Sequence, residues 1–140
     1  MLFALGDVKF INLPYDFAVN GDLTVMEGMT HIPFSIARVF VVRGFAGSIR
    51  GDHAHKACSQ FLTCPYGVVE VNCDDGSEVA TFVLDKPDIG LLIPPSIWAK
   101  QSYLIDNSVL TVLCDKPYET LDYIRNYEDY KEYRNIDSVI

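Results

Sequence analysis

Short runs of β-branched and aromatic residues, separated by turn residues, fill the middle of this chain. Val68–Cys73 leads through Asp74-Asp75-Gly76 into Ser77–Leu84, and an Asp-Gly pair between two such runs is a strong hairpin signal. Four other runs have a similar strand-like composition: Arg38–Val42, Gln60–Cys64, Ile89–Pro94 and Ser108–Cys114. Because no helical pattern alternates with these runs, the sequence predicts an all-β antiparallel sandwich or barrel.

The pattern changes near the C-terminus. From Thr120 onward, apolar residues recur at positions 121, 124, 127 and 130. This spacing predicts one short amphipathic helix, with Thr120 as its N-cap. The 140 residues contain no internal repeat, low-complexity tract or linker, so we expect residues 1–140 to form a single domain.

Composition narrows the class of protein. The net charge is −8, with six Asp/Glu against five Lys/Arg in residues 1–70 and thirteen against six in residues 71–140. Such an acidic chain is a poor candidate for nucleic-acid binding. It has no apolar run of the roughly 18 residues that a membrane span needs, and its start is a poor signal peptide. The four cysteines form no CxxC pair, which predicts reduced, mostly buried thiols in a cytoplasmic protein.

The heptapeptide RGDHAHK at residues 50–56 carries the clearest chemical signal. If it forms a strand, His53 and His55 face the same side, because residues two apart share a face. Three interpretations are open: a metal-binding pair, an acid–base pair, or two exposed histidines. Two imidazoles alone are few for a zinc or iron site. Their ordinary pKa of about 6.5 suits proton transfer near neutral pH.

The residues around this pair resemble the first motif of the cupin family. Five residues separate Gly47 from His53, four separate His55 from Gln60, and six separate Gln60 from Gly67. The resemblance implies a cupin jelly-roll β-barrel. It departs at Gln60, where metal-binding cupins usually carry glutamate, and their third histidine would fall at residues 99–100, which are Ala and Lys. We therefore expect no metal and no cofactor.

Four segments together resemble a narrower group, the cupin-type sugar 3,4-ketoisomerases that act on dTDP-4-keto-6-deoxyglucose. They are RGDHAHK, IPFSIARVF at 32–40, PPSIWAKQ at 94–101 and YETLDYIRNYEDY at 118–130. The resemblance covers residues 8–131. It implies a dTDP-linked keto-deoxysugar as substrate and a metal-free shift of the ketone from carbon 4 to carbon 3 through an enediol. It also implies that His53 removes the proton, while His55 shuttles it or holds the developing oxyanion.

The resemblance further implies a set of substrate-binding residues. Arg50 and Lys56 would supply positive charge near the diphosphate or the enolate, since arginine forks suit phosphate oxygens. Arg38 would serve likewise or form a structural ion pair, and Trp98 would stack on the ligand or belong to the core. The remaining candidates are Gln60, as a hydrogen-bonding group, Asn20, which with Ala99 occupies the positions that steer carbon-4 stereochemistry in the family, and Lys100, which is adjacent to Ala99.

Two other functions remain open from the sequence: a metal-dependent cupin enzyme and a non-catalytic nucleotide-sugar-binding cupin. In the leading interpretation an aminotransferase would consume the 3-keto product, in the biosynthesis of a lipopolysaccharide or other surface glycan. We also expect a homodimer formed through edge strands, with the N-terminal segment LFALGDVKFINL as the exchanged strand.

Overall fold

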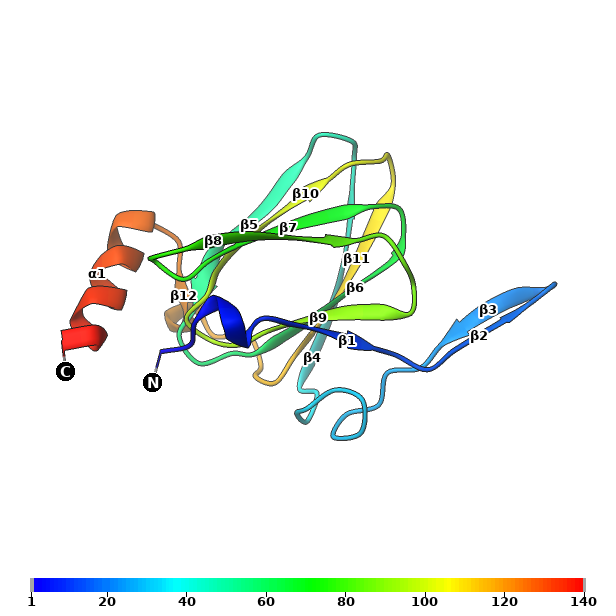
Figure 1. The fold of residues 1–140 in the computed structure, drawn as a ribbon, viewed down its shortest axis with the longest axis horizontal. Helices are drawn as coiled ribbons and strands as arrows, with labels where there is room; N and C mark the ends of the chain where they lie inside the picture. The colour runs from blue at the N-terminus through cyan, green and yellow to red at the C-terminus, as the bar shows by residue number, and fades with distance from the viewer. Residues whose placement is uncertain (1, 140) are drawn as a thin grey trace.

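The computed structural model describes residues 2–139, which form a β-barrel with one helix at the C-terminal end (Figure 1). Short 3₁₀ turns occur at Leu5–Asp7 and Thr120–Asp122. The strands and the helix are β1 Lys9–Asn12, β2 Tyr15–Ala18, β3 Gly21–Thr24, β4 Arg38–Gly44, β5 Ile49–His55, β6 Gln60–Tyr66, β7 Val69–Asp74, β8 Val79–Leu84, β9 Ile89–Ile93, β10 Trp98–Tyr103, β11 Ser108–Cys114, β12 Tyr123–Ile124 and α1 Tyr127–Val139.

Two five-stranded antiparallel sheets face each other. One has the order β1-β9-β6-β11-β4 and the other β12-β5-β10-β7-β8. Strands β4 to β11 thereby form two interlocked Greek keys, the jelly-roll arrangement. The predicted all-β barrel with a short C-terminal helix is confirmed. All six strand runs expected from the sequence are present, including the hairpin of β7 and β8.

The space between the sheets is filled by alternate residues of their strands. In β7, Val69, Val71 and Cys73 are buried while the residues between them are partly exposed, as expected for a strand with one face on the core. All four cysteines are buried free thiols, which confirms their predicted burial. Within residues 2–139, no helix is both long enough and apolar enough to cross a membrane.

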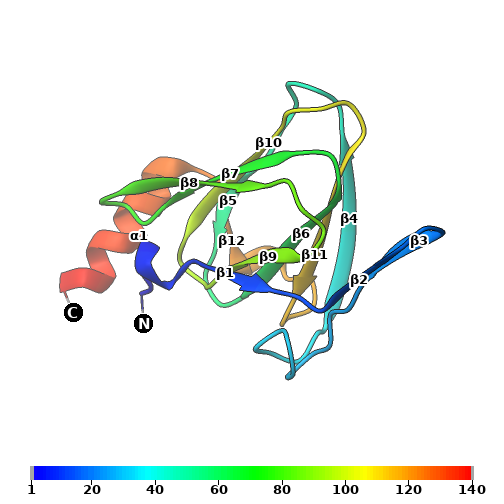
Figure 2. The ribbon, with the colours of Figure 1, turned by 45° about the vertical axis from the view of Figure 1, so that its right-hand side comes forward.

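A two-stranded hairpin leaves the barrel near the N-terminus. Strands β2 and β3 pair only with each other and project away from the barrel in both views (Figures 1 and 2). The preceding strand β1, which lies in the segment expected to be exchanged, pairs with β9 of its own chain, and its exchange between chains stays a prediction. The element that extends from the barrel is therefore the hairpin, not β1.

The C-terminal helix begins later than the periodicity predicted. Residues 120–122 form a 3₁₀ turn, Tyr123 and Ile124 pair with β5, and α1 begins at Tyr127. The prediction of Thr120 as N-cap was wrong. Asn126 takes that role, because its Oδ1 accepts the backbone N–H of Asp129 at 3.1 Å. Residues 123–124 pair with β5 rather than extend the helix, because this pairing buries Ile124 beside Ala54 and Trp98.

Candidate active site

A cavity of about 380 Å³ lies within the barrel. Its size suits a small ligand. Three of the predicted site residues, Arg50, His53 and Gln60, line it. The rest of its wall comes from β4, β5, β10, β11 and the C-terminal segment: Phe40, Val42, Ile49, Gly51, Gln101, Leu110, Val112, Tyr123 and Arg125.

An irregularity in β5 shapes this wall. In the pairing of β10 with β5, Ala99 is opposite His53 but Lys100 is opposite Gly51. Asp52 is thus an extra residue on β5, and it has a positive φ of 63°. This is a β-bulge, which shifts the alternation of side chains by one position.

The bulge explains why Arg50 and His53 line the same cavity. Residues three apart on a regular strand face opposite sides, and the extra residue removes that difference. Gly51 has φ 76°, and a Cβ there would lie 2.4 Å from Oε1 of Gln101. A larger residue would be strained at this φ and would have to displace the amide of Gln101. The side chain of Asp52 faces away and accepts a hydrogen bond of 2.9 Å from the indole of Trp98.

The two histidines share one face of β5, as the sequence predicted. Their ring centroids are 5.0 Å apart in an edge-to-face arrangement. His55 lies deeper, with 5% of its surface exposed, and its Nδ1 is 2.8 Å from Oδ2 of Asp122. The other oxygen of Asp122 accepts the backbone N–H of Ala57 at 2.7 Å. The carboxylate is therefore held from both sides and orients the imidazole.

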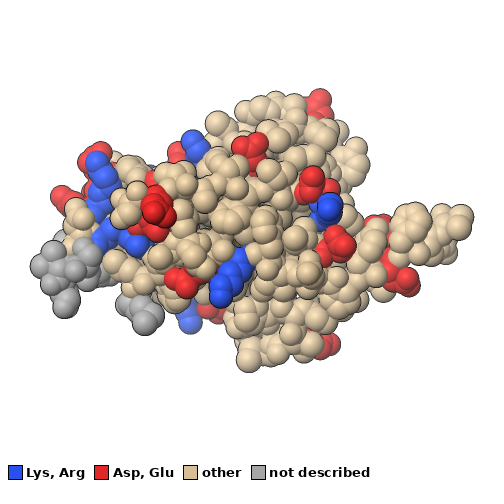
Figure 3. Space-filling view, in the orientation of Figure 1, with Lys and Arg blue, Asp and Glu red and all other residues tan. Residues whose placement is uncertain are grey.

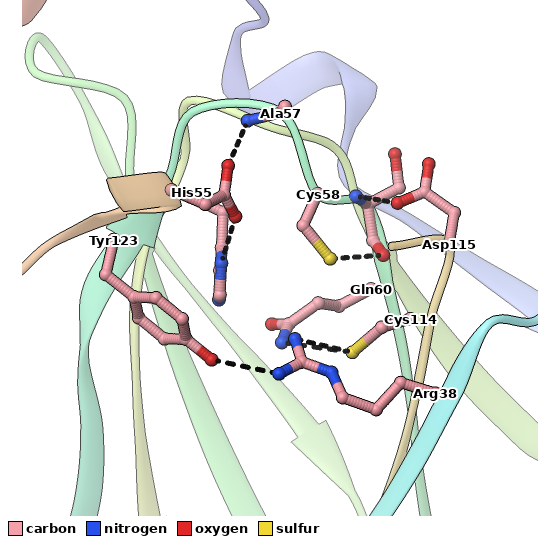
Figure 4. Close-up of polar contacts among 10 residues, drawn as sticks. Arg38, His55, Ala57, Cys58, Gln60, Cys114, Asp115 and Tyr123 are labelled. Carbon is pink, nitrogen blue, oxygen red and sulfur yellow. Dashed lines mark hydrogen bonds and ion pairs between the residues drawn. The ribbon is translucent and has the colours of Figure 1, made fainter. Parts of the chain in front are cut away.

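The ring of His55 points from its carboxylate partner toward Gln60 and Arg38 (Figure 4). Its Nε2 is buried and has no hydrogen-bond partner, and the same holds for Nδ1 of His53. When Nδ1 of His55 donates to Asp122, Nε2 is left with a free lone pair. This arrangement of carboxylate, imidazole and open acceptor is the one that general-base histidines use.

Burial keeps both histidines neutral at pH 7. It lowers the pKa of His53 to about 4, with the neighbouring His55 as a second cause. Burial also lowers the pKa of His55, and the hydrogen bond and charge of Asp122 oppose that shift. A neutral imidazole can accept a proton. Both imidazoles are therefore in the form that can act as a base.

A polar cluster on the neighbouring strands contains Gln60 and one further predicted residue, Arg38. Nη2 of Arg38 donates to Sγ of Cys114 at 3.5 Å, and Nε2 of Gln60 donates to the same sulfur at 3.7 Å (Figure 4). Arg38 also reaches the hydroxyl of Tyr123 at 3.4 Å. The neighbouring Cys58 thiol and the hydrogen bonds from Gln60 and Arg38 lower the pKa of Cys114. Sequence reasoning did not identify this thiol as the partner of Arg38.

The segment Asp-Tyr-Ile-Arg at 122–125 supplies functional side chains that the sequence interpretation missed. The ring of Tyr123 packs on His53 and His55 at centroid distances of 5.0 and 4.4 Å. The guanidinium of Arg125 lies over the Tyr123 ring at 4.3 Å, and both residues line the cavity. Because residues two apart on a strand share a face, the alternation in this segment was the sequence signal that could have identified Tyr123 and Arg125 as neighbours in the site.

Four predicted site residues lie elsewhere. Lys56 lines a separate cavity beside α1. Trp98 and Lys100 line a third cavity, on the outer face of β7 and β10, and Trp98 is buried. Asn20 lies in the turn of the β2–β3 hairpin. The fold therefore brings Arg38, Arg50, His53, His55 and Gln60 together, but not these four.

One group of metal-ligating side chains meets in the described part of the chain. The ligand atoms of His55, Cys58 and Asp122 all lie within 4.8 Å of one another. This group differs from the cupin-type set that the sequence suggested as an alternative, because it includes neither His53 nor the residue at position 60. Gln60 is neutral and directed to a thiol, so it does not replace the missing carboxylate ligand.

Comparison with known proteins places this geometry among relatives of known activity. The family described as FdtA: WxcM-like, C-terminal matches residues 6–135. The TDP-4-oxo-6-deoxy-alpha-D-glucose-3,4-oxoisomerase of Aneurinibacillus thermoaerophilus is 36% identical over 126 residues, which are 89% of this chain and 91% of that protein.

Two solved structures are also similar. QdtA, a sugar 3,4-ketoisomerase from Thermoanaerobacterium thermosaccharolyticum in complex with TDP, superposes with a TM-score of 0.90 at 32% identity, over 96% of this chain and 98% of that one. A histidine-to-asparagine mutant of QdtA has been solved with TDP-4-keto-6-deoxyglucose. WlaRB, a TDP-quinovose 3,4-ketoisomerase from Campylobacter jejuni, gives 0.85 at 30% identity, over 91% and 99% of the two chains.

Proposed function

This chain belongs to the FdtA, WxcM-like C-terminal family, and on that premise we propose that it is a TDP-sugar 3,4-ketoisomerase. Its substrate is TDP-4-keto-6-deoxyglucose, and the reaction moves the ketone from carbon 4 to carbon 3. The observation that carries the proposal is a pair of neutral histidines at a cavity, His55 buried and His53 partly exposed, in a chain 36% identical to an oxoisomerase of this sugar.

The chemistry requires proton transfer only. The ketone at carbon 4 acidifies the hydrogen on carbon 3, because the resulting anion is delocalised as an enolate. A base removes that proton, and the oxygen at carbon 4 is protonated to give a 3,4-enediol. Loss of the hydroxyl proton at carbon 3 and protonation of carbon 4 complete the exchange. No atom is gained or lost, and no electron leaves the sugar.

We assign proton removal at carbon 3 to His53 and the second proton-transfer role to His55. His53 lines the cavity, so it is the imidazole within reach of a bound sugar. His55 lies behind it and is oriented by Asp122. A histidine held by a carboxylate can take up a proton and return it, because the carboxylate stabilises the imidazolium that forms.

The cationic side chains of the wall suit the rest of the substrate. Arg50 and Arg125 both line the cavity, and guanidinium groups bind phosphate oxygens in a bidentate manner. We assign them to the diphosphate or to the enolate oxygen. Gln60 lies on the opposite sheet from His53, and its amide can hydrogen-bond a sugar hydroxyl across the cavity. Arg38 supports this arrangement through its contact with Tyr123.

The test is a proton spectrum of TDP-4-keto-6-deoxyglucose in deuterated water with the EDTA-treated protein. We expect loss of the carbon-3 proton signal and growth of a 3-keto sugar, whose carbon-4 configuration names the product. The variant His53→Asn should bind the nucleotide sugar without exchange. Binding without exchange in the wild type would instead identify a nucleotide-sugar-binding protein. Activity that EDTA abolishes and added metal restores would identify a metal-dependent enzyme.

We also propose that the protein acts as a homodimer joined through its hairpin. Phe17 and Leu23, on β2 and β3, are 74% and 60% exposed, and the end of the hairpin carries no charged side chain on the visible face (Figure 3). Strand β4 forms the edge of its sheet, and Val39 and Val41 on it are more than half exposed. Apolar residues on an unpaired edge favour association.

This assembly would also give Asn20 a role. The family resemblance places Asn20 at a substrate site, yet the hairpin holds it outside its own cavity, so we assign it to the site of the partner chain. Light scattering after gel filtration should give a dimer mass for the wild type and a monomer mass for Phe17→Asp. A wild-type monomer at micromolar concentration would contradict the proposal.

A further inference from the structure

We propose that His55, Cys58 and Asp122 form a binding site for a thiophilic divalent cation, Zn²⁺ in the first instance, and that its occupation stops proton transfer by His55. The site does not depend on the proposed function, whereas the inhibition does. It joins a soft sulfur, an imidazole nitrogen and a carboxylate oxygen within 4.8 Å.

The backbone arranges these ligands in advance. His55 ends β5, and two residues separate it from Cys58 in the connection to β6. A spacing of two residues between the first pair of ligands is common in zinc sites. Asp122 is fixed against this connection, because its backbone carbonyl accepts the N–H of Lys56 and its Oδ1 accepts the N–H of Ala57. Its Oδ2 remains directed at His55.

The buried polar atoms at this point favour a cation. His55 is 5% exposed and Cys58 2% exposed, so bulk water competes little with a cation for these two ligands. If Zn²⁺ occupied the place now taken by the proton between Nδ1 and Asp122, the imidazole would keep one proton at Nε2. The thiol proton of Cys58 would leave to solvent, as metal thiolates require. Three protein ligands and one water would complete a tetrahedral shell.

One of the three ligands, Asp122, lines a cavity beside the cluster. This cavity has a volume of about 280 Å³, and Ala57 also forms part of its wall. It is separate from the cavity that His53 lines, so zinc could enter while the nucleotide sugar is bound. A sulfur–nitrogen–carboxylate set selects Zn²⁺ over Mg²⁺, which prefers oxygen ligands.

Occupation would change what His55 can do. With zinc on Nδ1 and a proton on Nε2, the face of the imidazole toward the active cavity becomes a donor and loses its free lone pair. Proton transfer by His55 then stops, although the groups that bind the nucleotide sugar are untouched. We expect buffered Zn²⁺ to lower kcat more than tenfold with little change in KM, and EDTA to reverse the effect. Mg²⁺ should have no effect.

Cobalt substitution tests the site without any need for activity. Wild-type protein with Co²⁺ should show the near-ultraviolet charge-transfer band of a cobalt–thiolate bond. The band should be absent in Cys58→Ser and present in Cys64→Ser, a matched control in which another buried thiol is changed. Inhibition, measured against each variant's own metal-free rate, should need at least about tenfold more zinc in Cys58→Ser than in the wild type.

A second measurement uses no variant, in case Cys58→Ser fails to fold. Zinc should slow the alkylation of Cys58 by N-ethylmaleimide in the wild type, mapped by mass spectrometry, and leave Cys64 unaffected. No cobalt band in the wild type, a band that persists in Cys58→Ser, or no protection of Cys58 would overturn the zinc site. A cobalt band in a protein with no isomerase activity would uphold the site and refute the proposed function alone.

Discussion

Replacing Asp122 with asparagine should separate its effect on catalysis from its effect on stability. Each oxygen of the carboxylate accepts one hydrogen bond, from Ala57 at 2.7 Å and from His55 at 2.8 Å. Asparagine has a single oxygen, so it can keep only one of them. If it keeps Ala57, its amide N–H₂ faces Nδ1 of His55 and drives the imidazole proton to Nε2.

The size of both effects follows from these contacts. Losing one hydrogen bond to a charged group costs about 1.5–3 kcal/mol of folding free energy. The wrong tautomer removes the free lone pair at Nε2, and losing general acid–base catalysis costs about 10²–10⁴ in kcat. Urea unfolding gives the first number, and the rate at which the 3-keto sugar forms gives the second.

The control is Asp115→Asn. Oδ1 of Asp115 accepts the backbone N–H of Ser59 at 2.8 Å, and asparagine can keep that bond. We expect this variant to change kcat less than about threefold, as a surface-type substitution does. If Asp122→Asn loses stability but keeps kcat within the same range as Asp115→Asn, the carboxylate does not set the tautomer of His55, and the role assigned to it here is refuted.

The free energy of unfolding should fall as the pH drops from about 6.5 toward 4. The reason is that the pKa of folded His53 is lowered to about 4, so the unfolded chain takes up the proton first. Urea titrations should show a loss of at most about 3 kcal/mol across this window, and a smaller loss in His53→Asn. Gly90→Ala should destabilise the protein by about 1–3 kcal/mol in thermal unfolding, since the new Cβ would lie 2.1 Å from a phenylalanine ring. Gly6→Ala, where the new Cβ meets open space, should be nearly neutral. Arg50→Ala should raise KM about tenfold or more, whereas Lys56→Ala should change KM less than about twofold. The reason is that, of the two residues, only Arg50 lines the cavity beside His53. Equal effects of the two variants would contradict this placement.

The strand pattern and the shared face of the two histidines could be predicted because both depend on local alternation. His53 and His55 are two residues apart, and nothing between them interrupts the strand. The joint position of Arg50 and His53 could not be predicted in the same way, since it depends on the bulge at Asp52. The only sequence signal for that bulge is a Gly-Asp pair within a strand.

The stretch after Thr120 was misread because two periodicities overlap in it. Ile124 and Tyr130 fit a helical spacing and are indeed buried, but Leu121 is 79% exposed. Competition between helix and strand is decided by tertiary pairing, which a single sequence does not display. The same difficulty hid Asp122, because a carboxylate in an expected helix gives no sign that it will face a histidine 67 residues away.

On the proposed function, the position of that carboxylate would let two neutral histidines on one face of the barrel transfer protons. Burial alone makes both imidazoles poor proton acceptors, as the low pKa of His53 shows. Asp122 opposes this effect at His55 only, so the two rings differ in proton affinity although they share a strand face. A proton taken up by His53 at the open cavity would therefore have a more basic site, His55, beside it. The pairing of β12 with β5 directly after Asp122 places the carboxylate that creates this difference in proton affinity.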